Sequence, residues 1–301
     1  MPVLRRSALS AALLLVASSA LAMPPGAKKD LPPPPAESTP DIATNAKADP
    51  VLKAAIAAPT RPAADRARDG FRHPEETLLF WGLKPDMTVI DLQPGGGYWT
   101  EILAPYAAQT GGTYIGGVAD LANPKLSEGA KKGRANFEAK YADKGRYGTP
   151  RYTGFGPVSG PLAPANSVDL IITSREIHNW IAGGYFEKSL KDCYAALKPG
   201  GVLAIEEHRA DPKPQDAKAS SGYVATDTIV TAATKVGFKL AGASEINANP
   251  KDTKDYPFGV WTLPPTRTSS EGDHALTAAE RAKYDAIGES DRMTLRFRKP
   301  A

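Results

Sequence analysis

Short apolar runs rich in β-branched residues alternate with longer amphipathic stretches over most of this chain. Such runs are typical of buried strands, and the amphipathic stretches carry apolar residues at helical spacing. We expect strands at residues 88–92, 113–118, 149–158, 167–173, 202–206, 238–244 and 293–298. We expect helices at residues 74–82, 98–109, 125–144, 184–197, 226–236 and 277–286.

This alternation predicts an α/β fold with a doubly wound, mostly parallel sheet whose two faces are covered by helices. The last two expected strands, 238–244 and 293–298, have no strong crossover helix between them. An antiparallel last strand would explain this break in the rhythm. The long insert at 247–291 is expected either to wall a site or to form a surface loop.

The first 22 residues have the pattern of a secretory signal peptide. Arg5 and Arg6 precede a short apolar run, and residues 20–22 read Ala-Leu-Ala, a cleavage site. Cleavage there would give a secreted protein, periplasmic if the source is a Gram-negative bacterium. An uncleaved anchor is the alternative, although the run is short for a membrane span. We expect no integral membrane segment after cleavage.

Three further regions follow the expected signal peptide. Residues 23–40 are rich in proline, which favours an extended tether rather than a core. Residues 41–70 are Ala-rich and are expected to form an N-terminal helical extension, with a helix ending near Gly70. The remaining residues, 71–301, should form the main domain.

Composition narrows the function classes. The 301 residues are 42% hydrophobic and 23% charged, as in an ordinary globular protein. The 37 basic residues nearly balance the 33 acidic ones, which argues against a dedicated nucleic-acid binder. The single Cys193 excludes a disulfide framework within one chain and a zinc site built from several cysteines.

A glycine turn is the first chemical signal. The expected strand 88–92 carries Asp91 and is followed by Gly95-Gly96-Gly97 and a helix, which is the arrangement of a nucleotide-binding turn. Glycine lets the backbone approach a ligand, and the helix N-terminus offers free N–H groups. Simple packing of strand on helix remains the alternative. The turn lacks the Gly-Lys-Ser/Thr of a phosphate loop and the spacing of a dinucleotide fingerprint.

Three segments resemble class I S-adenosylmethionine-dependent methyltransferases. Residues 89–97 resemble the acidic-x-Gly-x-Gly-x-Gly signature, residues 167–172 the fourth strand, and residues 196–203 the Leu-Lys-Pro-Gly-Gly turn before the fifth. They occur in the family's order, and the resemblance extends over about residues 70–299. It implies a Rossmann-like, seven-stranded sheet with an antiparallel last strand. A closer likeness is to exported, predicted methyltransferases with a Pro-Gly-Gly-Gly-Tyr turn and a His-Asn-Trp after strand four.

The resemblance also implies a cofactor, S-adenosylmethionine, and residues to bind it. Six positions match the family's cofactor site: Asp91, Gln93, Gly95, Gly97, Asp120 and Ser174. Gln93 stands where the motif has its first glycine. Asp120 is the nearest acid to the end of the second strand, where the family usually has an acid for the ribose hydroxyls.

Polar and aromatic residues should converge beyond the carboxyl ends of the strands, where ligands bind in such sheets. We expect His178 and His208 to act as bases, with Glu207 or Glu176 orienting them. Four residues are expected to contact the acceptor: Tyr98, Trp99, Asn179 and Trp180. Structural roles for the histidines remain open. So does a metal site made of His178, Glu207 and His208, although we assign no metal.

The sequence therefore predicts methyl transfer from S-adenosylmethionine to a small molecule or an exported polymer. Two alternatives stay open. One is an exported ligand-binding protein that keeps the fold without catalysis, and the other is a metal-assisted hydrolase that uses the two histidines and Glu207.

Overall fold

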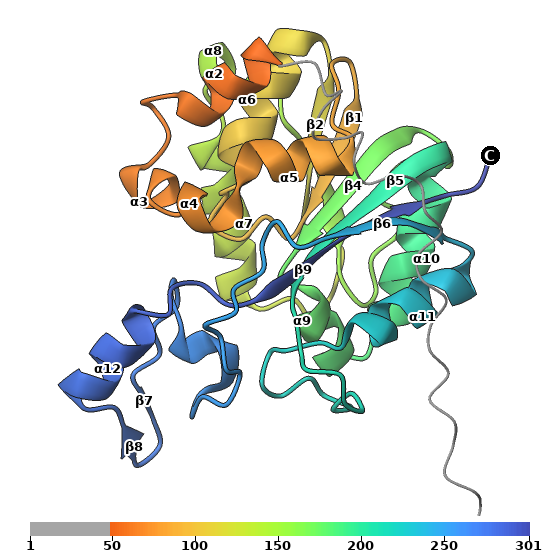
Figure 1. Cartoon of the computed structure of the whole chain (residues 1–301). Coiled ribbons are helices and arrows are strands. Elements are labelled where there is room, and N and C mark those ends of the chain that lie inside the picture. The colour runs from red at the N-terminus through yellow and green to blue at the C-terminus, as the bar shows by residue number, and fades with distance from the viewer. Residues whose placement is uncertain (1–48) are drawn as a thin grey trace, which may run out of the picture. The chain divides into compact units, whose positions relative to one another are not determined.

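The computed structural model describes residues 49–301 of the chain. The expected signal peptide, the proline-rich tether and residues 41–48 of the extension lie outside the described residues. Element labels are those of Figure 1.

A seven-stranded sheet has the order β3-β2-β1-β4-β5-β9-β6 (Figure 1). Its first five strands are parallel, and β9 is antiparallel to both β5 and β6. This confirms the doubly wound, mostly parallel sheet with an antiparallel last strand. The strands are β1 (Thr88–Leu92), β2 (Thr113–Ala119), β3 (Arg151–Phe155), β4 (Val168–Ser174), β5 (Leu197–His208), β6 (Lys239–Ser244) and β9 (Arg292–Arg298).

Alternating strand residues divide the core into two layers, because successive side chains of a strand point to opposite faces. Val89 and Leu170 join one apolar cluster, together with residues of α2 (Pro50–Ala57), α5 (Pro74–Trp81) and α6 (Thr100–Thr110). Ile90 and Ile171 join the other. That second cluster contains residues of α9 (Ile177–Ala182), α10 (Phe186–Ala196) and α11 (Thr226–Val236).

Helix ends follow local chemistry that the sequence displays. Helix α5 has Pro74 at its first position and ends at Gly82, whose φ of 83° is left-handed. Helix α11 ends in the same way at Gly237. The Lys-rich segment forms α7 (Glu128–Lys140), which begins after the capping side chain of Ser127, and a short α8 (Lys144–Tyr147) follows.

Three segments differ from the expectation, and one of them is α9, a helix that was not predicted. Residues 49–72 form three short helices, α2, α3 (Ala63–Arg66) and α4 (Asp69–Arg72), rather than one helix ending near Gly70. Strand β5 begins at Leu197 and runs to His208, so Glu207 and His208 lie within the strand and not after it. Hydrogen-bond pairing with β9 up to His208 and Arg292 extends the strand this far.

The insert between β6 and β9 is ordered around its own small apolar cluster, made of Tyr223, Tyr256, Val260 and Leu263. It contains η1 (Gly259–Thr262), a short hairpin of β7 (Ser270–Glu271) and β8 (His274–Ala275), and α12 (Ala278–Asp285). Helix α12 starts with a capping box between Thr277 and Glu280.

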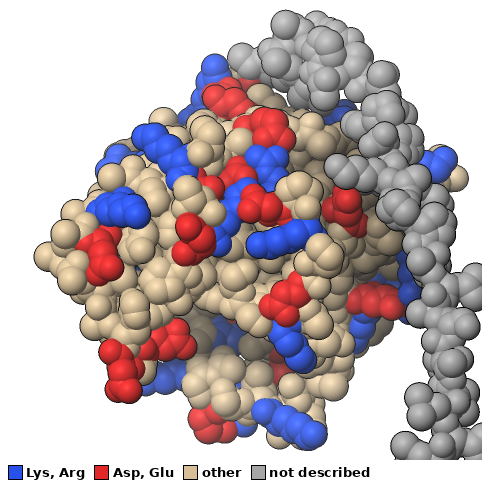
Figure 2. All heavy atoms as spheres, turned by 60° about the horizontal axis from the view of Figure 1, so that its bottom comes forward, with Lys and Arg blue, Asp and Glu red and all other residues tan. Residues whose placement is uncertain are grey.

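Acidic and basic side chains are interspersed on the face shown in Figure 2. Among residues 49–301, no helix combines the length and the apolar character that a membrane crossing requires.

Candidate active site

The glycine turn after β1 borders a cavity at the carboxyl end of the sheet. It is lined by residues 91–96, Tyr98 and Trp99, which run from the end of β1 to the start of the next helix. The rest of the lining comes from Ser174, Arg175 and Glu176 at and after the end of β4, and from Arg68 and Arg72 of the N-terminal helices. We call this space the turn cavity. The sequence motifs predicted that Gly95 and Ser174 would lie together here, but they did not predict Arg68 and Arg72.

Gly95 and Gly97 serve different purposes in the turn. Their φ angles are 55° and 91°, which favour glycine. A Cβ atom on Gly97 would lie 1.8 Å from Tyr141 Oη, whereas one on Gly95 or Gly96 would meet no heavy atom within 4 Å. Gly97 thus allows Tyr141 to pack against the turn, while Gly95 and Gly96 leave space for a ligand.

Asp91 is a buried carboxylate on the turn cavity. Tyr114 Oη donates to it at 3.2 Å and Thr100 Oγ1 at 3.4 Å, and Asp91 makes no ion pair with any described residue. Burial raises the pKa of Asp91 to about 7. A cationic group of a ligand would supply the missing partner.

Three arginines and two glutamates form a buried charge cluster next to this cavity. Arg72 Nε donates to both carboxylate oxygens of Glu289, at 3.1 and 2.9 Å. Arg292 Nη1 lies 2.7 Å from Glu289 and 3.0 Å from Glu206, and Arg175 Nη1 lies 4.0 Å from Glu289. Nη1 and Nη2 of Arg72 are buried and have no hydrogen-bond partner. These N–H groups suit an anionic group in the turn cavity.

The aromatic residues expected at the acceptor separate into two groups. Tyr98 and Trp99 line the turn cavity. Trp180 instead lies in the core and is fully buried. Its ring centre lies 5.2 Å from that of Phe155, and its Nε1 donates a hydrogen bond to Gln93 Oε1. Gln93 occupies the position of the motif's first glycine and has a left-handed φ of 51°. Its side chain therefore holds a core tryptophan through this hydrogen bond.

Asp120 follows β2 directly and is not among the residues that line the turn cavity. Strand β2 pairs with β1 and β3 without a register shift, so no bulge brings the acid closer. Its carboxylate accepts from Ala122 N at 3.0 Å, and a Cβ atom on Gly154 would lie 2.6 Å from Asp120 Oδ1. Gly154 thus makes room for this side chain in β3.

A second cavity adjoins the first, and we call it the acceptor cavity. Ser174, Arg175 and Glu176 line both cavities and form their common wall. The remaining lining comes from α9, from the end of β5 and from the insert: His178, Asn179, His208, Val260, Trp261, Pro264, Pro265 and Thr266. The insert therefore supplies an apolar wall opposite two histidines.

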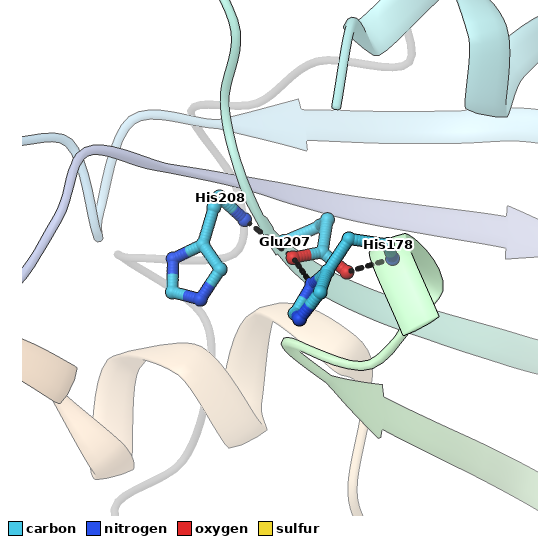
Figure 3. A group of neighbouring side chains, drawn as sticks. All are labelled: His178, Glu207 and His208. Atoms are coloured by element: carbon cyan, nitrogen blue, oxygen red, sulfur yellow. Dashed lines mark hydrogen bonds and ion pairs between the residues drawn. The ribbon is translucent and has the colours of Figure 1, made fainter. Parts of the chain in front are cut away.

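His178, Glu207 and His208 lie together, as Figure 3 shows, with ligand-type atoms within 4.8 Å of one another. Glu207 is fully buried and accepts from His178 Nδ1 at 3.1 Å and from the backbone N–H groups of Ile177, His178 and His208. His208 Nδ1 lies 2.5 Å from Ser290 Oγ.

The surroundings shift the pKa values of the two imidazoles in opposite directions. Burial opposes protonation of His178, but the negative charge of Glu207 outweighs it and raises the pKa of His178. Burial, together with the positive charges of His178 and Arg175, holds the pKa of His208 well below its ordinary value. His208 is therefore neutral at neutral pH.

The sequence analysis missed Arg72, Glu289, Ser290 and Arg292. Arg72 and Glu289 are 217 positions apart, so no local pattern links them. The available signal was the polar run Glu289-Ser290-Asp291-Arg292 directly before the last strand. All four of these residues are buried, and the three charged ones have ion-pair partners, as buried charges usually do.

Solved structures similar to this chain share its fold at low sequence identity. The [4+2]-cyclase SpnF is 16% identical, with a TM-score of 0.50 over 79% of this chain and 82% of its own. A SAM-dependent methyltransferase from Aquifex aeolicus is 19% identical, with a TM-score of 0.45 over 60% and 87%. Burkholderia thailandensis 1,6-didemethyltoxoflavin-N1-methyltransferase, solved with S-adenosylhomocysteine, is 13% identical, with a TM-score of 0.43 over 80% of each chain. No protein-family model and no curated protein matches the sequence.

At such identities the likeness concerns the fold. The seven-stranded sheet, its antiparallel last strand β9 and the glycine turn after β1 agree with the expectation from the three sequence motifs. The chain thus has the Rossmann-like fold that its resemblance to class I S-adenosylmethionine-dependent methyltransferases implied, and SpnF shares that fold.

Proposed function

We propose that this protein transfers the methyl group of S-adenosylmethionine to a small-molecule acceptor. The observation that carries the proposal is the incomplete pairing of two buried side chains on the turn cavity. Asp91 is a carboxylate without a cation among the described residues, and Arg72, although paired with Glu289 through Nε, has two NH2 groups without an acceptor. The amino-acid end of S-adenosylmethionine bears an ammonium and a carboxylate, which would complete both.

When bound, the cofactor supplies a methyl carbon activated by a sulfonium. The chain's own part is to hold that carbon and the acceptor in line, since alignment provides most of the rate in such displacements. The new bond forms from an acceptor lone pair, and the electrons of the broken C–S bond stay on sulfur. An acceptor that carries a proton would release it to water on the side of the acceptor cavity that His178 and His208 line.

The first test is calorimetric titration of the purified protein with S-adenosylmethionine and S-adenosylhomocysteine. We expect dissociation constants in the micromolar range for the wild type and no measurable binding for Gly96→Arg. Gly96 lines the turn cavity, has an ordinary φ, and offers open space for a side chain, so the substitution fills the cavity without straining the backbone. Gly133→Arg, on the exposed side of α7, is the matched control.

Absence of heat at millimolar ligand from the folded wild type would overturn the proposal. Binding of both ligands without methyl transfer to any acceptor in a broad screen would instead favour the non-catalytic ligand-binding protein.

We propose further that the protein is exported and acts on an acceptor outside the cytoplasm. The support is the signal-peptide pattern of residues 1–22. N-terminal sequencing of the mature protein should begin at Met23. A mature chain that retains Arg5 and Arg6 would contradict the proposal.

A further inference from the structure

The two histidines of the acceptor cavity are oriented in the same manner. In each, Nδ1 has a partner: Glu207 for His178, and Ser290 for His208. In Figure 3 the other ring nitrogen of each, Nε2, points away from Glu207 and to the same side. Both residues line the acceptor cavity. Each imidazole thus has one nitrogen held by the protein and one available to a ligand.

The spacing of the rings suits a single ion between them. The ring centres of His178 and His208 are 5.5 Å apart. Ligand-type atoms of the two residues lie within 4.8 Å of each other, and two nitrogens on one zinc ion lie at most about 4 Å apart, because each Zn–N bond is about 2.0 Å long. One ion of this size can therefore contact both nitrogens after small side-chain adjustments.

Glu207 is placed to orient a ligand rather than to be one. Its carboxylate accepts from three backbone N–H groups and from His178 Nδ1, which uses the four lone-pair directions that a carboxylate offers. A metal-binding histidine usually donates its other N–H to a carboxylate or similar acceptor, which fixes its ring orientation. Ser290 provides the corresponding contact for His208.

We propose that the acceptor cavity binds one divalent metal ion such as Zn²⁺ through Nε2 of His178 and Nε2 of His208. Glu207 and Ser290 are positioning residues that orient the two rings. The inference deepens the proposed function, because the open coordination positions would face an acceptor in the same cavity. An oxygen or sulfur acceptor bound to the ion would lose its proton to water more easily, since a metal ion stabilises the anion. Its lone pair would then be free to form the bond to the methyl carbon.

The charges around the site set its strength. Glu207 and Glu176 favour a cation. Arg175 in the common wall, Arg292 and Arg72 oppose it. With only two protein ligands, we expect a dissociation constant in the micromolar range, so the ion would exchange with solution. Imidazole nitrogen suits Zn²⁺ and Co²⁺, whereas Mg²⁺ and Ca²⁺ prefer oxygen ligands.

The test is calorimetric titration of the chelator-treated full chain with Zn²⁺, without any cofactor. We expect one bound ion, no binding of Mg²⁺, and a Co²⁺ complex whose visible absorption reports nitrogen ligation. His178→Ala and His208→Ala should each weaken Zn²⁺ binding at least 100-fold. His274→Ala, on the exposed hairpin, is the matched control and should leave binding unchanged.

Ser290→Ala and Glu207→Gln separate positioning from direct ligation, and each should weaken binding 10- to 100-fold. Wild-type protein that binds Zn²⁺ no better than the double variant of His178 and His208 would overturn the inference. The result is independent of the cofactor proposal, because Gly96→Arg should lose S-adenosylmethionine and keep Zn²⁺. Loss of both ligands in a protein shown to be folded would contradict this separation of the two cavities.

Discussion

Replacement of Asp91 by Asn is expected to stabilise the folded protein above neutral pH while it weakens the binding of S-adenosylmethionine. The carboxylate is buried, has no ion pair among the described residues, and has its pKa raised from 3.8 to about 7. Ionising it inside the folded protein therefore costs free energy that an amide does not cost. A bound cation would offset this cost, which is why the residue is expected to favour the ligand.

The sign and size of the effect follow from proton linkage. Between about pH 4 and about pH 7 the unfolded chain has released the Asp91 proton and the folded chain retains it. The free energy of unfolding of the wild type should thus fall, relative to Asp91→Asn, by about 4 kcal/mol over this window, at about 1.36 kcal/mol per pH unit. Above the window the difference should be constant.

Urea denaturation of both proteins at a series of pH values measures the difference. Asp273→Asn, in the exposed hairpin turn between β7 and β8, is the control and should follow the wild type at every pH. A difference between wild type and Asp91→Asn that does not change from pH 4 to pH 8 would show that Asp91 is not held protonated by burial. Titration at pH 8 should show at least tenfold weaker binding of S-adenosylmethionine by the variant.

Glu289→Gln should be the most destabilising single change in the charge cluster. Glu289 is 3% exposed, and its negative charge offsets part of the positive charge of Arg72, Arg175 and Arg292. Burial opposes its ionisation, but these arginines outweigh burial and lower the pKa of Glu289. Removing one partner of a buried ion pair leaves an uncompensated charge and costs about 3 to 5 kcal/mol.

The measurement is the free energy of unfolding at neutral pH, from urea denaturation. Glu271→Gln makes the same chemical change on the exposed β7 strand and should cost less than about 0.5 kcal/mol. A loss below about 1 kcal/mol for Glu289→Gln would mean that water reaches the cluster and screens the arginines.

The strands of the sheet were predictable from sequence because they depend on local patterns. Short apolar runs rich in β-branched residues marked the strands, glycines marked the ends of α5 and α11, and the absence of a crossover helix before residues 293–298 indicated the antiparallel β9. The same reasoning placed Asp91, Ser174, His178 and His208 at one edge, since the carboxyl ends of parallel strands meet there.

Side-chain direction was not predictable in the same way. Trp180 is adjacent to Asn179 in α9, yet the rotation of about 100° between consecutive helix residues directs Trp180 into the core while Asn179 lines the acceptor cavity. Ser290 is the hydrogen-bond partner of His208, and Glu289 is that of Arg72. Both partners lie at the C-terminal end of the insert. Pairings over such separations depend on tertiary packing, which no spacing within the sequence encodes.

The sheet can be completed only after β9 has been synthesised, because β9 lies between β5 and β6. Within the described sheet, β6 forms its backbone hydrogen bonds with β9 alone, and β9 also supplies Arg292 to Glu206 and Glu289. A ribosome produces β9 after the other strands of this sheet, so a nascent chain cannot close the sheet or pair Glu206 with Arg292 until that segment has emerged. Contacts of such high sequence separation also slow folding. The described fold is therefore completed only when the last of its strands has been made.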